Sequence, residues 1–165
     1  PYLQFSLSSN GDSLALDPAA IVSSATPGPA IVNIKTNASK GWIGWVKSQN
    51  SGLTSAAASK TINNIGTVDG APSTLTIGNE AYGLDTSIFT DSGTAGTGAV
   101  TIDPEYEGSA TEVGTLTNTY NRFAYASGPT DNDYVTLTLR STISPLTPAA
   151  SDYTDVLTVI GAGNF

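Results

Sequence analysis

The chain has 165 residues, of which 12% are charged, and its formal net charge at pH 7 is −8. Its six lysines and arginines are dispersed and form no basic surface for a nucleic acid or an anionic membrane, so we expect neither partner. Cys and His are absent, which excludes thiol and imidazole catalysis and most zinc sites. No apolar run is long enough to cross a bilayer.

Short segments of alternating polar and apolar residues, separated by Gly-, Pro- and Asn-rich turns, indicate an all-β domain. Strands are predicted at residues 2–9, 30–36, 42–48, 75–77, 81–89, 119–126, 134–140 and 153–160, and Leu14 and Leu16 begin a further short one. The Ala-rich stretch 55–60 is the one place where a helical turn is expected, with a loop as the alternative. Residues 91–98, rich in Gly and Thr, predict a loop. The pattern shows no internal repeat and no second domain.

Carboxylates are the remaining candidates for catalysis. Asp103, Glu105 and Glu107 are two residues apart, which on a strand places them on one face. A glycoside hydrolase needs two carboxyl groups held roughly 5 to 10 Å apart across a sugar cleft, and nothing else in the sequence suggests such a cleft. An exposed acidic edge beside Pro104 is the favoured interpretation. We therefore expect a protein that is not an enzyme and has no cofactor.

The run Asp131-Asn132-Asp133 has the clustered oxygen ligands that Ca²⁺ prefers, but it lacks the Gly and Glu of an EF-hand loop. An Asx-rich turn is the favoured alternative, since Asn and Asp side chains bond their own backbone. Trp42 and Trp45 offer aromatic surface for stacking on a sugar. Being three apart on a strand, they point to opposite faces, which favours one core Trp and one outer Trp over a carbohydrate platform.

Two modifications are suggested by local sequence. Asn37-Ala38-Ser39 matches the N-glycosylation acceptor pattern and lies in a predicted loop. Lys35 and Lys47 lie on predicted strands, where the lysines of Gram-positive pilins form isopeptide bonds with Asn. That reaction needs a buried Lys beside an Asn and a carboxylate.

The sequence opens at Pro1-Tyr2-Leu3 without an initiator Met or a leader-like segment. Together with the Ser- and Thr-rich, charge-poor composition, this start predicts a mature product that is secreted and lies at the cell surface. The absence of Cys and Met is compatible with export, because the chain offers nothing that is easily oxidised.

The run from Pro148 to Val159, Pro-Ala-Ala-Ser-Asp-Tyr-Thr-Asp-Val-Leu-Thr-Val, resembles the final-strand signature of spore coat protein U and related pilin-like fimbrial subunits. Thr36-Asn37-Ala38-Ser39-Lys40-Gly41-Trp42 is similar to a hairpin common in that group, and Ala81-Tyr82-Gly83-Leu84 also fits it. Ser151 stands where the family usually has Gly. The resemblance implies an immunoglobulin-like antiparallel β-sandwich that a neighbour's terminal strand completes by donor-strand complementation.

On this resemblance, residues 1–9 are the candidate donor strand and residues 10–165 a single sandwich domain. Leu3, Phe5 and Leu7 share one face of the first strand and are predicted to anchor it in the next subunit. The alternative is that this segment is the first strand of its own domain. The expected function is that of a structural subunit of a pilus- or fimbria-like extracellular filament, with copies of itself and glycans as partners. A secreted carbohydrate-binding module and a sheath- or shell-forming surface protein remain as alternatives.

Overall fold

The structure, a computed structural model, describes residues 1–93 and 98–165. In these residues the chain forms, in order, β1 (Leu3–Leu7), β2 (Val22–Ser23), β3 (Ala30–Thr36), β4 (Trp42–Ser48), β5 (Gly52–Ser55), β6 (Lys60–Asn63), β7 (Ser73–Thr74), β8 (Ala81–Thr90), β9 (Val100–Ile102), the 3-10 helix η1 (Pro104–Tyr106), β10 (Glu112–Val113), β11 (Asn121–Ala126), β12 (Thr130–Thr142) and β13 (Leu157–Gly163). The predicted all-β class is confirmed.

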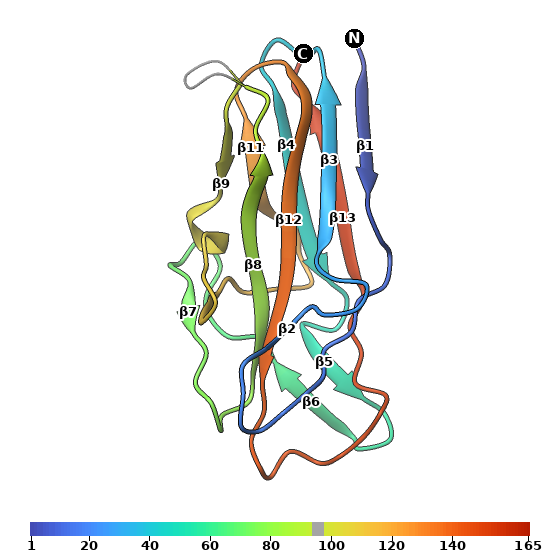
Figure 1. The fold of residues 1–165 in the computed structure, drawn as a ribbon, viewed down its shortest axis with the longest axis vertical. Coiled ribbons are helices and arrows are strands. Elements are labelled where there is room, and N and C mark those ends of the chain that lie inside the picture. The colour runs from blue at the N-terminus through green and yellow to red at the C-terminus, as the bar shows by residue number, and fades with distance from the viewer. Residues whose placement is uncertain (94–97) are drawn as a thin grey trace.

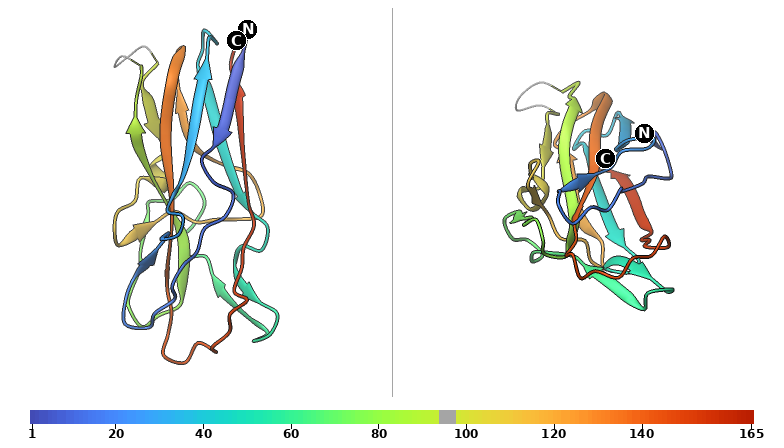
Figure 2. Two further views of the ribbon diagram at one scale, coloured as in Figure 1. Left: turned by 45° about the vertical axis from the view of Figure 1, so that its right-hand side comes forward. Right: turned by 60° about the horizontal axis from the view of Figure 1, so that its bottom comes forward.

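Two antiparallel sheets lie face to face and form a sandwich (Figure 1). One sheet has the order β1–β3–β12–β8, and β2 continues along the edge of β12 beyond the end of β3. The other has the order β13–β4–β11–β9. The hairpin β5–β6 and the short pair β7–β10 lie toward the end away from both chain termini, which meet at the opposite end (Figure 2).

The sandwich follows from the strict alternation of buried and less buried side chains along the central strands. In β3, Val32 and Ile34 are buried between the sheets, and in β4 Trp42 and Val46 face them from the other side. Successive side chains of a strand point to opposite faces, so each sheet gives one apolar face to the core. The largest fully buried side chains are Trp42, Tyr82, Tyr106, Phe123, Ile34, Ile62, Leu84 and Leu116.

Several predicted elements differ from those observed. The strand expected at Leu14 and Leu16 is wrong, because this stretch has no partner strand in the described structure, although both side chains pack against the core. The helical turn expected at 55–60 is instead the turn of the hairpin β5–β6. The strand expected at 75–77 is also wrong, since β7 ends just before it.

The last strand is shifted relative to its predicted range of 153–160 and runs from Leu157 to Gly163. Thr154 forms only an isolated bridge with Thr54, so the ladder with β4 begins later. The loop predicted at 91–98 lies partly outside the described residues.

Candidate functional site

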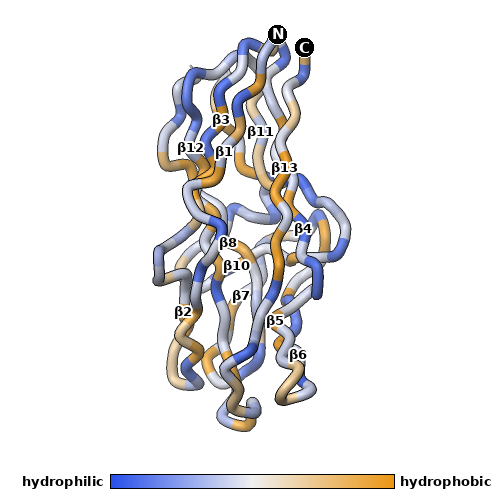
Figure 3. The backbone as a smooth tube through the Cα atoms, turned by 90° about the vertical axis from the view of Figure 1, so that its right-hand side faces the viewer, coloured by the Kyte–Doolittle hydropathy of each residue, from blue (hydrophilic) through white to orange (hydrophobic). Residues whose placement is uncertain are grey.

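Strand β1 is an edge strand of its sheet. It pairs antiparallel with β3 of the same chain, from Leu3 opposite Thr36 to Leu7 opposite Val32. No strand of the described residues pairs with its outer edge. Because β13 is the edge strand of the facing sheet, the first and last strands of the chain lie side by side (Figure 3). In this structure β1 thus completes its own sandwich, and its pairing with a neighbour stays a prediction.

Hydrogen bonds beyond the ladder hold both ends of β1. At the first end, the backbone N–H of Tyr2 donates to Asn37 Oδ1 at 2.8 Å, and Thr36 Oγ1 donates to the Tyr2 carbonyl at 2.7 Å. At the other end, the Ser8 N–H donates to the Ile31 carbonyl at 2.9 Å, and Ser8 Oγ accepts the Ile31 N–H at 2.8 Å. The register of β1 on β3 is therefore fixed by side chains as well as by the ladder.

The three predicted anchor residues do not share one environment. Leu3 and Phe5 are half-buried and pack against the core of their own domain. Leu7 is 39% exposed and lies at the edge of a cleft. Leu3 and Phe5 therefore carry most of the apolar contact of this strand, and Leu7 carries less.

Phe5 rests against Gly161 of β13. A Cβ at position 161 would lie 2.5 Å from Cδ2 of Phe5, so only glycine lets the ring approach this closely. The contact joins the two sheets on the side where β1 and β13 form the edges. Sequence reasoning missed Gly161, although a glycine inside an apolar final strand is the signal of a close approach.

Beyond Leu7 no strand of the described residues lies in the gap between the sheets, and the gap forms a cleft of about 380 Å³. Its apolar walls come from both sheets and from β1, and they comprise Leu7, Ala30, Leu137, Leu139, Leu157 and Val159. The turn at residues 9–12 borders it. Strand β1 therefore covers only part of the opening between the β3 and β13 edges.

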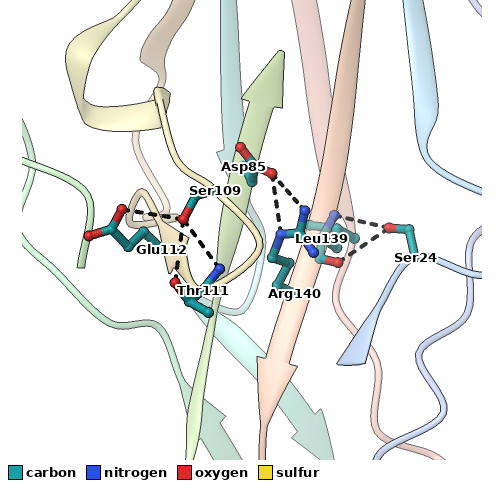
Figure 4. Close-up of polar contacts among 7 residues, drawn as sticks. All are labelled: Ser24, Asp85, Ser109, Thr111, Glu112, Leu139 and Arg140. Atoms are coloured by element: carbon teal, nitrogen blue, oxygen red, sulfur yellow. Dashed lines mark hydrogen bonds and ion pairs between the residues drawn. The ribbon is translucent and has the colours of Figure 1, made fainter. Parts of the chain in front are cut away.

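The segment from residue 1 to residue 21, which we term the N-terminal arm, is anchored at its far end. There β2 pairs with Arg140 and Ser141 of β12, and Ser24 Oγ accepts the Leu139 N–H at 2.9 Å (Figure 4). Beside this anchor, Arg140 donates to Asp85 through Nε at 3.2 Å and through Nη2 at 2.8 Å. The pairing of β2 with β12 therefore fixes the far end of the N-terminal arm, whereas β1 is held separately by its own pairing with β3.

The edges of β1 and β13 carry no charged residue and no proline. Free strand edges in natural proteins are usually protected by Lys, Pro, bulges or a covering segment, because an unprotected edge is a template for another strand. The two edges on this side of the sandwich lack the protective residues. This side is therefore suited to strand addition.

The predicted acidic edge is wrong. Asp103 and Glu105 are buried, and only Glu107 is exposed, because the three residues belong to the turn of η1 and its flanks and not to a strand. Pro104 at the start of η1 fixes the backbone dihedral that begins this turn. The spacing of two therefore does not place the carboxylates on one face.

Each buried carboxylate of this group has a structural partner. Asp103 forms an ion pair with Arg122, with 2.9 Å between Oδ2 and Nη2. Glu105 Oε2 accepts the backbone N–H of Asp69 at 3.0 Å, whereas its Oε1 has no partner among the described residues. Burial is the main cause that raises the pKa of Glu105.

The Asx-rich turn favoured for Asp131-Asn132-Asp133 is wrong, because the run lies within β12, where a β-bulge divides it. Asn132 has a φ of +71°, and the register of β12 on β3 shifts there. Asp131 is exposed and forms an ion pair with Lys35, whereas Asp133 is fully buried and accepts the indole N–H of Trp42. The structure thus contradicts a calcium site shared by these two carboxylates.

Trp42 and Trp45 lie on opposite faces of β4, as predicted. Trp42 is fully buried, and Trp45 is half-buried on the outer face of the sheet. Because the two rings face different ways, they do not form a stacking platform for a sugar.

The predicted modification sites lie at the surface. Asn37 is exposed in the loop between β3 and β4, and its glycosylation stays a prediction. Lys35 is partly exposed in its pair with Asp131, and the Lys47 ammonium lies 4.9 Å from the ring centroid of Tyr120. Neither lysine is buried, as an isopeptide bond would require.

Within the described residues, no helix is long and apolar enough to cross a bilayer. Comparison of the chain with protein-family models, with curated proteins and with solved structures found no match.

Proposed function

We propose that this protein is a structural subunit of an extracellular, pilus-like filament and that neighbouring subunits are joined by exchange of β1. The observation that carries the proposal is the position of β1, an uncharged edge strand that closes the sandwich and is tethered through the N-terminal arm to the anchor at β2. Strand addition to an unprotected sheet edge is a recurrent mode of protein association.

In the exchanged state, β1 of one subunit pairs with β3 of the next in the register that it adopts within its own chain. Leu3 and Phe5 then pack on the neighbour's core, and Phe5 rests on the neighbour's Gly161. Because the contacts are the same in both states, exchange loses little contact energy, and protein concentration decides which state dominates. Each contact is head-to-tail, so repetition without closure produces a filament.

The surface composition supports a subunit that is covered by its neighbours. With 12% charged residues, the chain carries few charges whose burial between subunits would cost desolvation energy. The structural partners of Asp103, Asp85 and Asp133 also support a role for these carboxylates in stability and not in catalysis.

Engineered disulfides distinguish the two states of β1. Gln4 of β1 lies opposite Lys35 of β3, and neither side chain is in the core. The chain has no Cys, so the double variant Gln4→Cys, Lys35→Cys introduces the only thiols. Directly opposite residues have Cβ atoms about 5 Å apart, close to the separation that a disulfide spans.

The variant is concentrated under reducing conditions, oxidised and run on a non-reducing gel, with electron microscopy of the same sample. Exchange predicts covalent ladders and filaments. The control pair Ile43→Cys, Tyr125→Cys joins the inner strands β4 and β11 and should give only monomers. A Gln4–Lys35 disulfide found solely within monomers at every protein concentration would show that β1 does not exchange and would overturn the proposal.

A further inference from the structure

The turn that follows β1 contains Asn10-Gly11, the only Asn-Gly pair of the chain, and both residues are exposed. An asparagine can cyclise when the backbone nitrogen of the next residue attacks its side-chain carbonyl carbon. Glycine as the next residue favours this attack, because it has no side chain that hinders the approach. In a folded protein, the reaction also requires that the attacking N–H and the side-chain amide are free to meet.

At Asn10-Gly11 both reacting groups are free. Within residues 1–93 and 98–165, the Gly11 N–H donates no hydrogen bond and the Asn10 side chain takes part in none. The Ser9 hydroxyl donates to the Gly11 carbonyl at 3.3 Å, which involves neither reacting group. A Cβ at position 11 would have no heavy atom within 4 Å apart from its chain neighbours, so the surrounding space is open.

The structure holds the comparable pair Asn50-Ser51 in place. The Ser51 N–H donates to Ser48 Oγ at 2.7 Å, and the Asn50 amide donates to the Thr154 carbonyl at 3.3 Å. Each bond must break before the Ser51 nitrogen can reach the Asn50 side chain. The fold therefore protects this pair from cyclisation, although serine is also a small second residue.

The one Asp-Gly pair, Asp69-Gly70, is held in a similar way. The Gly70 N–H donates to the Thr67 carbonyl at 3.1 Å, and the Asp69 N–H donates to Glu105 Oε2 at 3.0 Å. A Cβ at position 70 would lie 2.5 Å from Thr67 Oγ1, so the backbone of this turn is closely packed. Of the three pairs, Asn10-Gly11 alone combines a free N–H with open space.

We propose that Asn10 undergoes deamidation through a succinimide. The Gly11 nitrogen gives its proton to water and attacks Cγ of Asn10, the Cγ–Nδ2 bond breaks, and the side-chain nitrogen takes up a proton and leaves as ammonia. Water then adds to one of the two carbonyl carbons of the ring, and the bond from that carbon to the Gly11 nitrogen breaks. Addition at Cγ yields aspartate, and addition at the main-chain carbonyl yields isoaspartate.

Either product changes the border of the cleft beyond Leu7, because Asn10 and Asp12 both line it. A new carboxylate at position 10 adds one negative charge close to that of Asp12. Isoaspartate also adds a carbon atom to the backbone of the turn that connects β1 to the rest of the N-terminal arm. The deamidation site does not depend on exchange of β1, and either proposal can fail alone.

The test is incubation of the purified full chain at pH 6 and at pH 8, followed by proteolysis and tandem mass spectrometry. We expect the peptide that carries Asn10 to gain the mass of the change from amide to acid, and to become a substrate for protein L-isoaspartate methyltransferase. Conversion at Asn10 should be about tenfold faster than at Asn50. It should also be faster at pH 8, because the attack requires that the Gly11 nitrogen loses its proton.

Unfolding separates protection by the structure from the effect of the sequence. In concentrated urea, conversion at Asn50 should rise about tenfold because its hydrogen bonds are lost, whereas conversion at Asn10 should change by less than about threefold. Gly11→Ala should slow conversion at Asn10 about tenfold. This substitution fits the fold, since position 11 has open space and no left-handed φ.

Three results would overturn the proposal. One is conversion at Asn10 in the folded chain that is no faster than at Asn50. Another is a rate at Asn10 that rises in urea as much as the rate at Asn50, which would show that the turn protects it. The third is conversion that Gly11→Ala leaves at full rate, because the succinimide route depends on the residue at position 11.

Discussion

The indole N–H of Trp42 donates a 2.9 Å hydrogen bond to the carboxylate of Asp133 in the interior of the sandwich. Trp42 belongs to β4 and Asp133 to β12, so this bond connects the two sheets. The other carboxylate oxygen accepts the N–H and the hydroxyl of Ser92, at 3.0 and 2.9 Å. The fully buried carboxylate of Asp133 thus accepts hydrogen bonds from three donors. They compensate for the hydrogen bonds to water that it loses on folding.

Replacement of this carboxylate should be costly. We expect Asp133→Ala to lower the free energy of unfolding by about 3 kcal/mol, because the buried donors of Trp42 and Ser92 lose their acceptor. Asp131→Ala removes an exposed carboxylate two residues away and should change stability by less than about 0.5 kcal/mol. Urea denaturation followed by tryptophan fluorescence measures both, and equal effects of the two variants would contradict the assigned role.

The contact of Phe5 with Gly161 predicts a specific coupling. Phe5→Ala should destabilise the domain by about 2 kcal/mol, and Gly161→Val should also destabilise it, because the new side chain meets the ring. In the double variant the smaller residue at position 5 makes room, so the loss should be smaller than the sum of the single losses by about 1 kcal/mol. Denaturant titrations of the four proteins give the coupling energy, and strict additivity would show that the two residues do not touch.

The buried Glu105 predicts a pH dependence of stability. Burial raises the pKa of Glu105 above its ordinary value of 4.5. Its contribution to stability is therefore fully present below that ordinary value and is lost as the pH rises through the folded-state pKa. Glu105→Gln cannot ionise, so its stability relative to the wild type should increase from pH 4 to pH 7. Glu107→Gln, at the exposed neighbouring position, should show no such increase in the same urea titrations.

The buried hydroxyls of Tyr82 and Tyr106 predict a contrast in stability. Tyr106→Phe removes a satisfied hydrogen bond to the Thr115 carbonyl and should lower the free energy of unfolding by about 1.5 kcal/mol. Tyr82→Phe removes a hydroxyl that has no partner among the described residues, so its effect should stay within about 0.5 kcal/mol. Thermal denaturation of the purified variants tests this contrast, and a larger loss for Tyr82→Phe would show that its hydroxyl is paired within the domain.

The sequence by itself determined the class of the fold and its central strands. The ranges predicted for β3 and β4 match those observed, and the opposite orientations of Trp42 and Trp45 follow from the same alternation. Alternation is a local property, since successive side chains of a strand must point to opposite faces whatever the strand pairs with. The strand at residues 2–9 was predicted on the same basis, and it forms from Leu3 to Leu7.

Only the tertiary structure decided where the polar residues of these segments lie. Asp133 pairs across the core because a bulge at Asn132 shifts the strand, and Glu105 is buried because Pro104 begins a helical turn. Gly161 gains its significance from Phe5, which lies near the other end of the chain. Burial and pairing depend on contacts between segments distant in sequence, which the local period of a strand does not encode.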